Sequence, residues 1–291
     1  MEESVFDLVL CRRESADATA AIWVFWDCAH QDGVATEVAG ISYRDDDSAE
    51  FKQKILDMVE RRSVMIVGIT FSYDLLRQLK RHAMKIVVLD HQKNPPISHK
   101  AFSFYHSDPE RTPSQMAWDY LYPGRARPWF LEVAAARYLR KATEEDRAYY
   151  RGITLLGQWE LPFLTLLQNS TNKALRRTML EEGRRALEPY HYMARYHTKD
   201  ATIHIGEDIY HIRIMACDHP FIRPDVGDLI TEESKDFALI YSYNLQQDNW
   251  YYTLHQPDGG TLKLTLLAQK LGGEGYTAEF YSPTSPHALV E

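Results

Sequence analysis

An acid and an imidazole directly follow a short apolar run of the chain. Ile86 to Leu89 are four apolar residues, three of them β-branched, and Asp90, His91 and Gln92 come next. Such a run is typical of a buried strand rather than a helix. Open parallel α/β sheets bind ligands at the carboxyl ends of their strands, so the pair predicts a metal or ligand site. The alternative is a polar strand exit without function.

A second acid is predicted at the same edge of the sheet. Ser4 to Leu10 predicts a first strand, and Ala18 to Trp26, rich in alanine and large apolar residues, predicts the helix after it. A turn between strand and helix directs side chains and amides at the end of the sheet. We therefore expect Asp17 to share a cleft with Asp90 and His91.

Composition limits the classes of function. The chain has 291 residues, 45% of them hydrophobic, enough for one large or two medium cores. Its formal net charge of -8 argues against extended duplex binding but permits a local basic pocket. The three cysteines lack metal spacing, and the sequence shows neither a signal-peptide pattern nor an apolar run long enough to span a membrane. We expect a soluble cytoplasmic protein without membrane contact.

The remaining segments predict a two-domain α/β protein. Alternating strand and helix patterns fill the N-terminal half, a helical pattern runs from Glu144 to Pro189, and alternating strands follow from Thr202 onward. We expect an N-terminal parallel sheet flanked by helices over residues 1–145, a helical connection over 146–199, and a smaller mixed α/β domain over 200–291. One continuous sandwich is the alternative topology.

Three segments, in this order, resemble the DHH phosphoesterase superfamily. Asp90-His91-Gln92-Lys93 resembles the family's Asp-His-His-Lys after an apolar strand. Thr112 to Pro123 resembles its Ser-Gly-Ala-x-Leu-Ala-Trp-x-Tyr-Leu-Phe-Pro segment. Gly272 to Tyr276 resembles the glycine-rich loop of the family's associated C-terminal domain, in which histidine stands where this chain has Tyr276. The resemblance covers about residues 5–145 and 200–285.

The resemblance implies a cleft with two divalent metals, usually manganese, and most of the implied ligand positions are altered. Asp17, Asp90 and His91 match family ligands, and Gln92 replaces the second histidine of the motif. Residues that do not suit a metal stand at four further ligand positions: Arg12, Ser15, Thr70 and Ala135. A fixed guanidinium repels a metal ion, the threonine hydroxyl is a poor replacement for the family's bridging aspartate, and the alanine has no group that binds a metal.

We therefore expect a DHH-like protein that has lost catalysis and serves binding or assembly, with no cofactor. An anion would be held by Arg12 and by a loop of four residues: Gly272, Gly273, Gly275 and Tyr276. Expected partners are a phosphorylated small molecule or short oligonucleotide, a second copy, or an assembly partner. We also expect Asp17 and Asp90 to pair with Arg12 or Arg13.

Two other hypotheses stay open. A working Mn²⁺ or Mg²⁺ phosphoesterase, acting on a nucleotide, oligonucleotide or polyphosphate, would have to recruit other ligands, for which Glu14, Asp27, His30 and Asp74 are the candidates. A purely structural or interaction protein is compatible with the 18 tyrosines, because tyrosine is favoured at interfaces.

Overall fold

The computed structural model of the protein describes residues 6–12, 15–41, 48–91, 98, 102–169, 173–218, 222–231, 234–256, 260–273 and 278–290. The chain divides into two compact units, Met1–Glu181 and Glu182–Glu291, and the boundary between them falls within a long helix. Each unit has a five-stranded sheet of its own.

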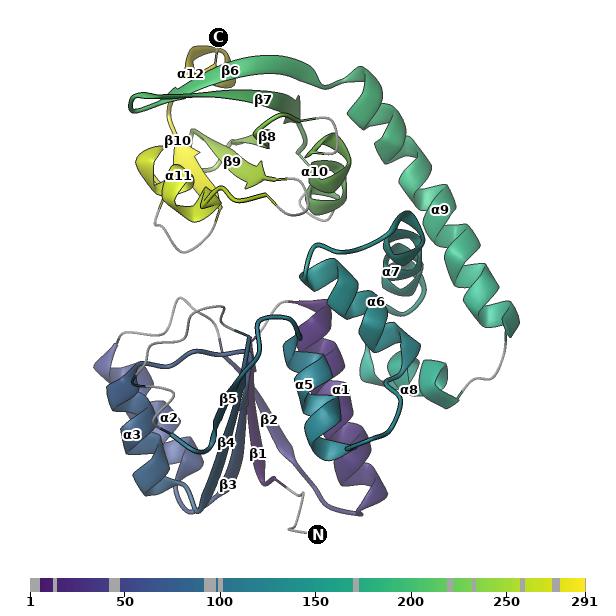
Figure 1. Ribbon diagram of the computed structural model, residues 1–291, viewed down its shortest axis with the longest axis vertical. Coiled ribbons are helices and arrows are strands. Elements are labelled where there is room, and N and C mark those ends of the chain that lie inside the picture. Colours follow the sequence, from purple (N-terminus) through teal and green to yellow (C-terminus); the bar gives the residue numbers. More distant parts are fainter. Residues whose placement is uncertain are drawn as a thin grey trace. The chain divides into compact units, whose positions relative to one another are not determined.

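The first unit is built on a parallel sheet with the strand order β2-β1-β3-β4-β5. Helices α1 and α5 lie on one face of this sheet, and α2 and α3 lie on the other (Figure 1). Its elements are β1 (Leu8–Arg12), α1 (Ala16–Gln31), β2 (Glu37–Ile41), α2 (Ala49–Val59), β3 (Ser63–Val67), α3 (Tyr73–His82), β4 (Lys85–Asp90), β5 (Tyr105–Ser107) and α5 (Pro113–Leu121).

Both faces of this sheet are buried, which explains why its central strands are apolar throughout. Successive side chains of a strand point to opposite faces. In β4, Val87 and Leu89 therefore pack with α1 and α5, whereas Ile86 and Val88 pack with α2 and α3. The β-branched run of the sequence is thus a fully buried parallel strand, as predicted.

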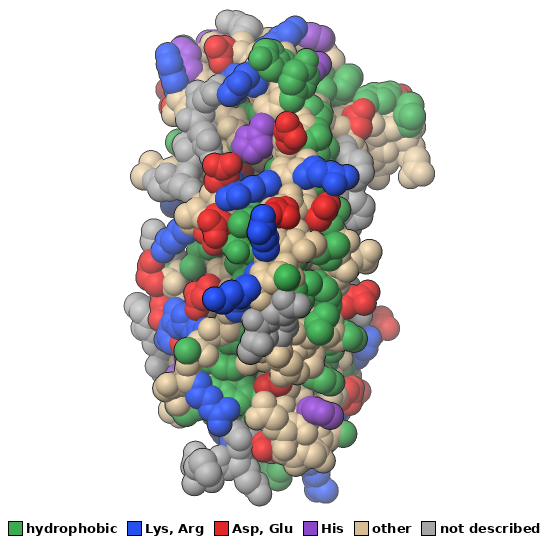
Figure 2. Space-filling model, turned by 90° about the vertical axis from the view of Figure 1, so that its right-hand side faces the viewer, with side chains coloured by type: hydrophobic (Ala, Val, Ile, Leu, Met, Phe, Trp, Pro, Cys, Tyr) green, Lys and Arg blue, Asp and Glu red, His purple; other side chains and the backbone are tan. Residues whose placement is uncertain are grey.

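Four more described helices follow α5 in the sequence. They are α6 (Trp129–Tyr138), α7 (Glu144–Gly157), α8 (Leu161–Asn169) and α9 (Lys173–Tyr196). Apolar residues of α6, α7 and α8 join the core on the α1 face of the sheet. In α9, Arg177 pairs with Glu181, and the face shown in Figure 2 carries basic and acidic side chains interspersed. This part of α9 therefore offers no uniformly basic surface to a nucleic acid.

The second unit contains a mixed sheet with the order β10-β9-β8-β7-β6, in which only β7 and β8 pair in parallel. The fold class expected from the sequence, a parallel α/β sheet followed by a mixed one, is confirmed. The elements of the second unit after α9 are β6 (Lys199–Ile205), β7 (Asp208–Ala216), α10 (Arg223–Thr231), β8 (Phe237–Asn244), β9 (Asn249–His255), α11 (Leu264–Lys270), β10 (Glu279–Ser282) and α12 (Pro286–Leu289).

The first strand differs from its prediction in a way that matters for the site. It continues to Arg12, which pairs in register with Ile41 of β2. Arg12 is thus the last residue of a strand and not part of the turn. Its backbone is held by pairing with the neighbouring strand β2. Among the described residues, no helix combines the length and the apolar character needed to cross a membrane.

Candidate functional site

The candidate site lies where β1, β3 and β4 end and α1 and α5 begin. Ser15 caps α1 by accepting a hydrogen bond from the Ala18 amide (3.0 Å). Thr112 caps α5 in a capping box with Gln115, and Pro113 occupies the first helical turn. Both helices therefore begin at the carboxyl edge of the sheet.

Asp17 lies in the first turn of α1 and is held by the start of α5. It is 2% exposed and accepts hydrogen bonds from both the Ser114 amide (3.2 Å) and the Ser114 hydroxyl. The Ser114 hydroxyl lies 3.1 Å from that of Thr112. Asp17 and Ser114 are 97 residues apart in the sequence, so this bond joins two helix starts that only the fold brings together.

Burial raises the pKa of Asp17 above its ordinary value of 3.8, because desolvation disfavours the carboxylate. Hydrogen bonds from Ser114 and Thr112 act in the opposite direction but do not cancel it. An acid that ionises less readily than usual is a poorer ligand for a cation, which must compete with the proton.

We expect the contribution of Asp17 to stability to fall as the pH rises. The folded state holds this proton more tightly than the unfolded state, so the free energy of unfolding decreases from the unfolded pKa of 3.8 up to the raised folded pKa. The Asp17→Asn variant lacks the ionisation. Urea unfolding at about pH 4 and about pH 7 should therefore show the wild type losing stability relative to the variant. Exposed Asp74→Asn serves as the control, and a pH-independent difference for Asp17→Asn would contradict the prediction.

Asp90 ends β4 and is fully buried, with 0% exposure. One carboxylate oxygen accepts hydrogen bonds from the hydroxyls of Thr70 (2.7 Å) and Tyr105. The other accepts the amide of His91 (2.8 Å). Burial and the bond to Asp90 raise the pKa of Tyr105, which keeps its phenol protonated as a donor. The carboxylate of Asp90 is thus enclosed by three neutral donors.

His91 is held by a tyrosine from α6. Its Nε2 lies 2.7 Å from the Tyr138 hydroxyl, and the two rings meet edge to face with centroids 5.1 Å apart. Its Nδ1 is buried, lies 3.8 Å from an Asp90 oxygen and has no hydrogen-bond partner among the described residues. Desolvation lowers the pKa of His91; Asp90 opposes this effect and the positive charge of Arg12 adds to it. The imidazole is therefore neutral at neutral pH.

A small pocket joins the two parts of the site. It has a volume of about 10 Å³ and is lined by residues that include Arg12, Ser15, Asp17, Gly68 and Tyr138. A volume of that size holds about one water molecule. The structure thus brings Arg12, Ser15 and Asp17 together at one pocket, and connects them through Tyr138 to His91 and Asp90.

The carboxylates have neutral donors in place of the expected arginine. Asp17 is bonded by Ser114 and Asp90 by Thr70 and Tyr105. The expectation that either acid forms an ion pair with Arg12 was wrong, because a hydroxyl satisfies a buried carboxylate without burying a guanidinium as well. Arg13, the other expected partner, lies outside the described residues, as do Glu14, Gln92, Gly275 and Tyr276.

The described replacement ligands considered from the sequence, Asp27, His30 and Asp74, do not gather at this site. Asp27 lies ten residues beyond Asp17 on the same helix, which places it about 15 Å away. It accepts the Tyr122 hydroxyl (2.6 Å), and His30 stacks on Trp26. Asp74 is exposed at the start of α3, close to Arg77. Across the part of the chain that is described, no group of three or more His, Cys, Asp or Glu residues is placed to hold a metal ion.

Ala135 and the two described glycines of the C-terminal loop have structural surroundings of their own. Ala135 is buried on α6, one turn before Tyr138. The amides of Gly272 and Gly273 donate to Gln269 and Ala268 carbonyls at the end of α11. A Cβ at Gly273 would lie 2.7 Å from the Glu279 carbonyl oxygen. These two amides end a helix beside β10 and are not open to an anion.

The site residues that the sequence did not reveal are Ser114, Tyr105 and Tyr138. Each reaches its partner from another element, and hydroxyl residues of this kind occur throughout the chain. The only signal was indirect: Ser114 lies in the segment from Thr112 to Pro123, which was recognised as a motif without a role for its serine.

Comparisons with known proteins complete the description of this fold. No protein-family model matches the chain. The uncharacterized protein R106 of Acanthamoeba polyphaga mimivirus is 21% identical over 267 residues, which cover 88% of this chain and 61% of the relative. The chain thus spans less than two thirds of that protein's length.

Two solved structures are similar over nearly the whole chain. The pGpG-specific phosphodiesterase PggH from Vibrio cholerae has a TM-score of 0.54 at 10% identity, with 96% of this chain and 94% of that one covered. CDC45 from Entamoeba histolytica has a TM-score of 0.51 at 6% identity, with 94% and 91% covered. The family resemblance inferred from the sequence motifs is therefore confirmed at the level of the fold.

Proposed function

We propose that this chain, which has the fold of the DHH phosphoesterases, does not hydrolyse phosphoesters and instead uses the fold for binding or assembly. One observation carries the proposal. The two acids that the resemblance assigns to metal ions are both buried and bonded to neutral donors of the chain itself.

The donor set does not fit two divalent cations. Such a site needs several carboxylates and imidazoles around a pair of metals that share a water molecule. Thr70 stands where the family has its bridging aspartate, and its hydroxyl donates to Asp90. A hydrogen bond thus occupies the carboxylate lone pair that a shared cation would need. Arg12 adds a fixed positive charge at the same pocket.

Assembly is favoured over small-molecule binding at this site. The pocket beside Arg12 has a volume of about 10 Å³, so a phosphate group would have to displace the side chains around it. The two described glycine amides of the C-terminal loop donate within the chain. A phosphorylated small molecule or short oligonucleotide therefore remains the second candidate partner.

The first test measures metal content and hydrolysis on the purified full chain. After equilibration with Mn²⁺ and gel filtration, we expect well below one metal ion per chain by elemental analysis. Turnover of pGpG, short oligonucleotides and polyphosphate should be no greater for the wild type than for the matched Asp17→Asn and Asp90→Asn variants. Near two metal ions per chain, or turnover that these substitutions abolish, would overturn the proposal.

Calorimetry tests the second candidate partner separately. We expect no binding of pGpG tighter than the millimolar range at low salt. If pGpG binds more tightly than this and Arg12→Ala weakens the binding, the pocket is an anion site. Anion binding would then replace assembly as the proposed role.

A further inference from the structure

The second unit contains a pocket of about 420 Å³ that involves none of the residues discussed above as a candidate site. It is formed by the end of α9, the start of β6, the end of β7, the middle of β8, and α12. The volume lies in the range of pockets that enclose small molecules. All of its lining residues belong to one compact unit, so its shape is independent of the first unit.

The position of this pocket follows from the topology of the sheet. Among the described strands of this sheet, β7 and β8 are the only parallel pair, and Ala216, the last residue of β7, is the register partner of Tyr241 in β8. Both residues line the pocket. Carboxyl ends of parallel strands are where α/β sheets leave a crevice for ligands. The second unit therefore has a crevice of its own.

The walls of the pocket are largely apolar. Ile214, which is 8% exposed, and Tyr241 lie on one face of the sheet, whereas Met193 and Met215 pack on the other. The Tyr241 ring adds an aromatic surface, and its hydroxyl forms no hydrogen bond to a described residue. This part of the pocket suits a flat or branched apolar body with one polar group near the tyrosine.

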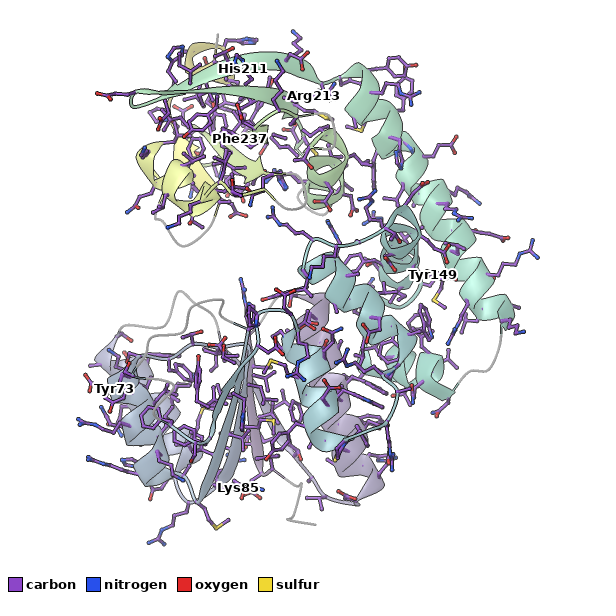
Figure 3. The ribbon with its side chains drawn as sticks, viewed as in Figure 1. Tyr73, Lys85, Tyr149, His211, Arg213 and Phe237 are labelled. Atoms are coloured by element: carbon purple, nitrogen blue, oxygen red, sulfur yellow. The ribbon has the colours of Figure 1, made fainter. Side chains whose placement is uncertain are left out.

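The rim of the pocket is basic. Lys199 is exposed and forms no ion pair with any residue that the structure describes, and His197 and His287 also lie at the rim. Among the described lining residues, Asp200 is the only acid, and it lies 3.5 Å from Arg213 of β7, which is labelled in Figure 3. Because Arg213 lies close to Asp200, Lys199 is the described charge at the rim that has no opposite charge beside it.

We propose that this pocket binds a small amphipathic anion, with an apolar or aromatic body against Ile214 and Tyr241 and a carboxylate, sulfonate or phosphate at Lys199. Register pairing places these three residues on one face of the sheet. The apolar wall supplies burial, and Lys199, which forms no ion pair with a described acid, selects the charge of the ligand. The inference does not depend on the loss of hydrolysis in the first unit.

Two fluorescent probes test the proposal on the full chain. 1-Anilinonaphthalene-8-sulfonate is an aromatic anion, and N-phenyl-1-naphthylamine has the same body without the sulfonate. We expect one saturable site for the anionic probe. Lys199→Glu should weaken its binding about tenfold or more and leave the neutral probe within about twofold, because only the anion meets the reversed charge. Lys235→Glu, at an exposed lysine outside the pocket, should change neither.

A blocking variant locates the probe. Ala216 is exposed at the end of β7, so Ala216→Trp should leave the thermal melt close to that of the wild type while it abolishes binding of both probes. The proposal would be overturned by any of three results: either pocket variant binds the anionic probe as the wild type does, Lys199→Glu weakens the binding of both probes equally, or the anionic probe binds without saturation.

Discussion

Removing both hydroxyls from Asp90, as Thr70→Val together with Tyr105→Phe, is expected to lower the free energy of unfolding by about 3–6 kcal/mol. Each hydroxyl donates to the same oxygen of a fully buried carboxylate, and a hydrogen bond to a charged group contributes about 1.5–3 kcal/mol. Urea unfolding followed by tryptophan fluorescence measures the loss. A decrease below about 1 kcal/mol would show that the carboxylate finds other donors.

Two further variants separate the charge from the packing. Tyr73→Phe removes a hydroxyl from a tyrosine that is 38% exposed at the start of α3 (Figure 3), and it should cost less than about 0.5 kcal/mol. Adding Asp90→Asn to the double variant removes the uncompensated charge, so part of the lost stability should return. If it does not, the loss arises from packing at Thr70 and Tyr105.

Gly68→Ala is expected to destabilise the protein by about 2–5 kcal/mol. Gly68 follows β3 with a φ of +65°, and a Cβ there would lie 2.8 Å from Cγ of Pro113. The left-handed backbone costs about 1–2 kcal/mol for a residue with a side chain, and overpacking adds about 1–3 kcal/mol. Because the proline ring cannot turn aside, the start of α5 must shift, and with it Ser114. The free energy of unfolding in urea again measures the effect.

Gly33→Ala is the matched control for this change. Gly33 has a φ of +68°, and a Cβ there would have no atom within 4 Å, so the variant should show the backbone cost alone, about 1–2 kcal/mol. Adding Pro113→Ala to Gly68→Ala should restore the stability that Gly68→Ala loses beyond the loss of Gly33→Ala, because it removes the ring that the new Cβ contacts. Equal losses at Gly68 and Gly33 would show that the contact with Pro113 relaxes freely.

The sequence predicted the elements whose signals are local. The apolar run Ile86 to Leu89 lies within β4, which extends one residue further at each end, and Thr112 and Pro113, at the start of the motif segment, begin α5. Helix α10 and strand β10 were not predicted, because they are short and lack clear periodicity. In α7, the apolar residues Leu155 and Leu156 are 48% and 45% exposed, so residue type alone does not indicate which leucines are buried.

The site was predictable only as a location. Asp17, Asp90 and His91 do lie at the carboxyl edge of the sheet. This position was predictable because polar residues that follow apolar parallel strands lie at that edge. Their partners did not follow, because Ser114 lies 97 residues from Asp17, and Tyr138 lies 47 from His91. A sequence without a comparison of relatives does not indicate which of many hydroxyls will reach a buried acid.

The hydroxyls around Asp90 also bear on the order in which substitutions can accumulate. An aspartate restored at Thr70 would place a second carboxylate against the first before any cation had a complete set of ligands, and like charges repel most strongly when they are buried. Tyr105 would still donate to Asp90 and so occupy part of the carboxylate that a bound ion would need. A lineage with this arrangement would thus pass through less stable intermediates on any stepwise return to metal binding, whereas drift among neutral residues at Thr70 carries a smaller cost.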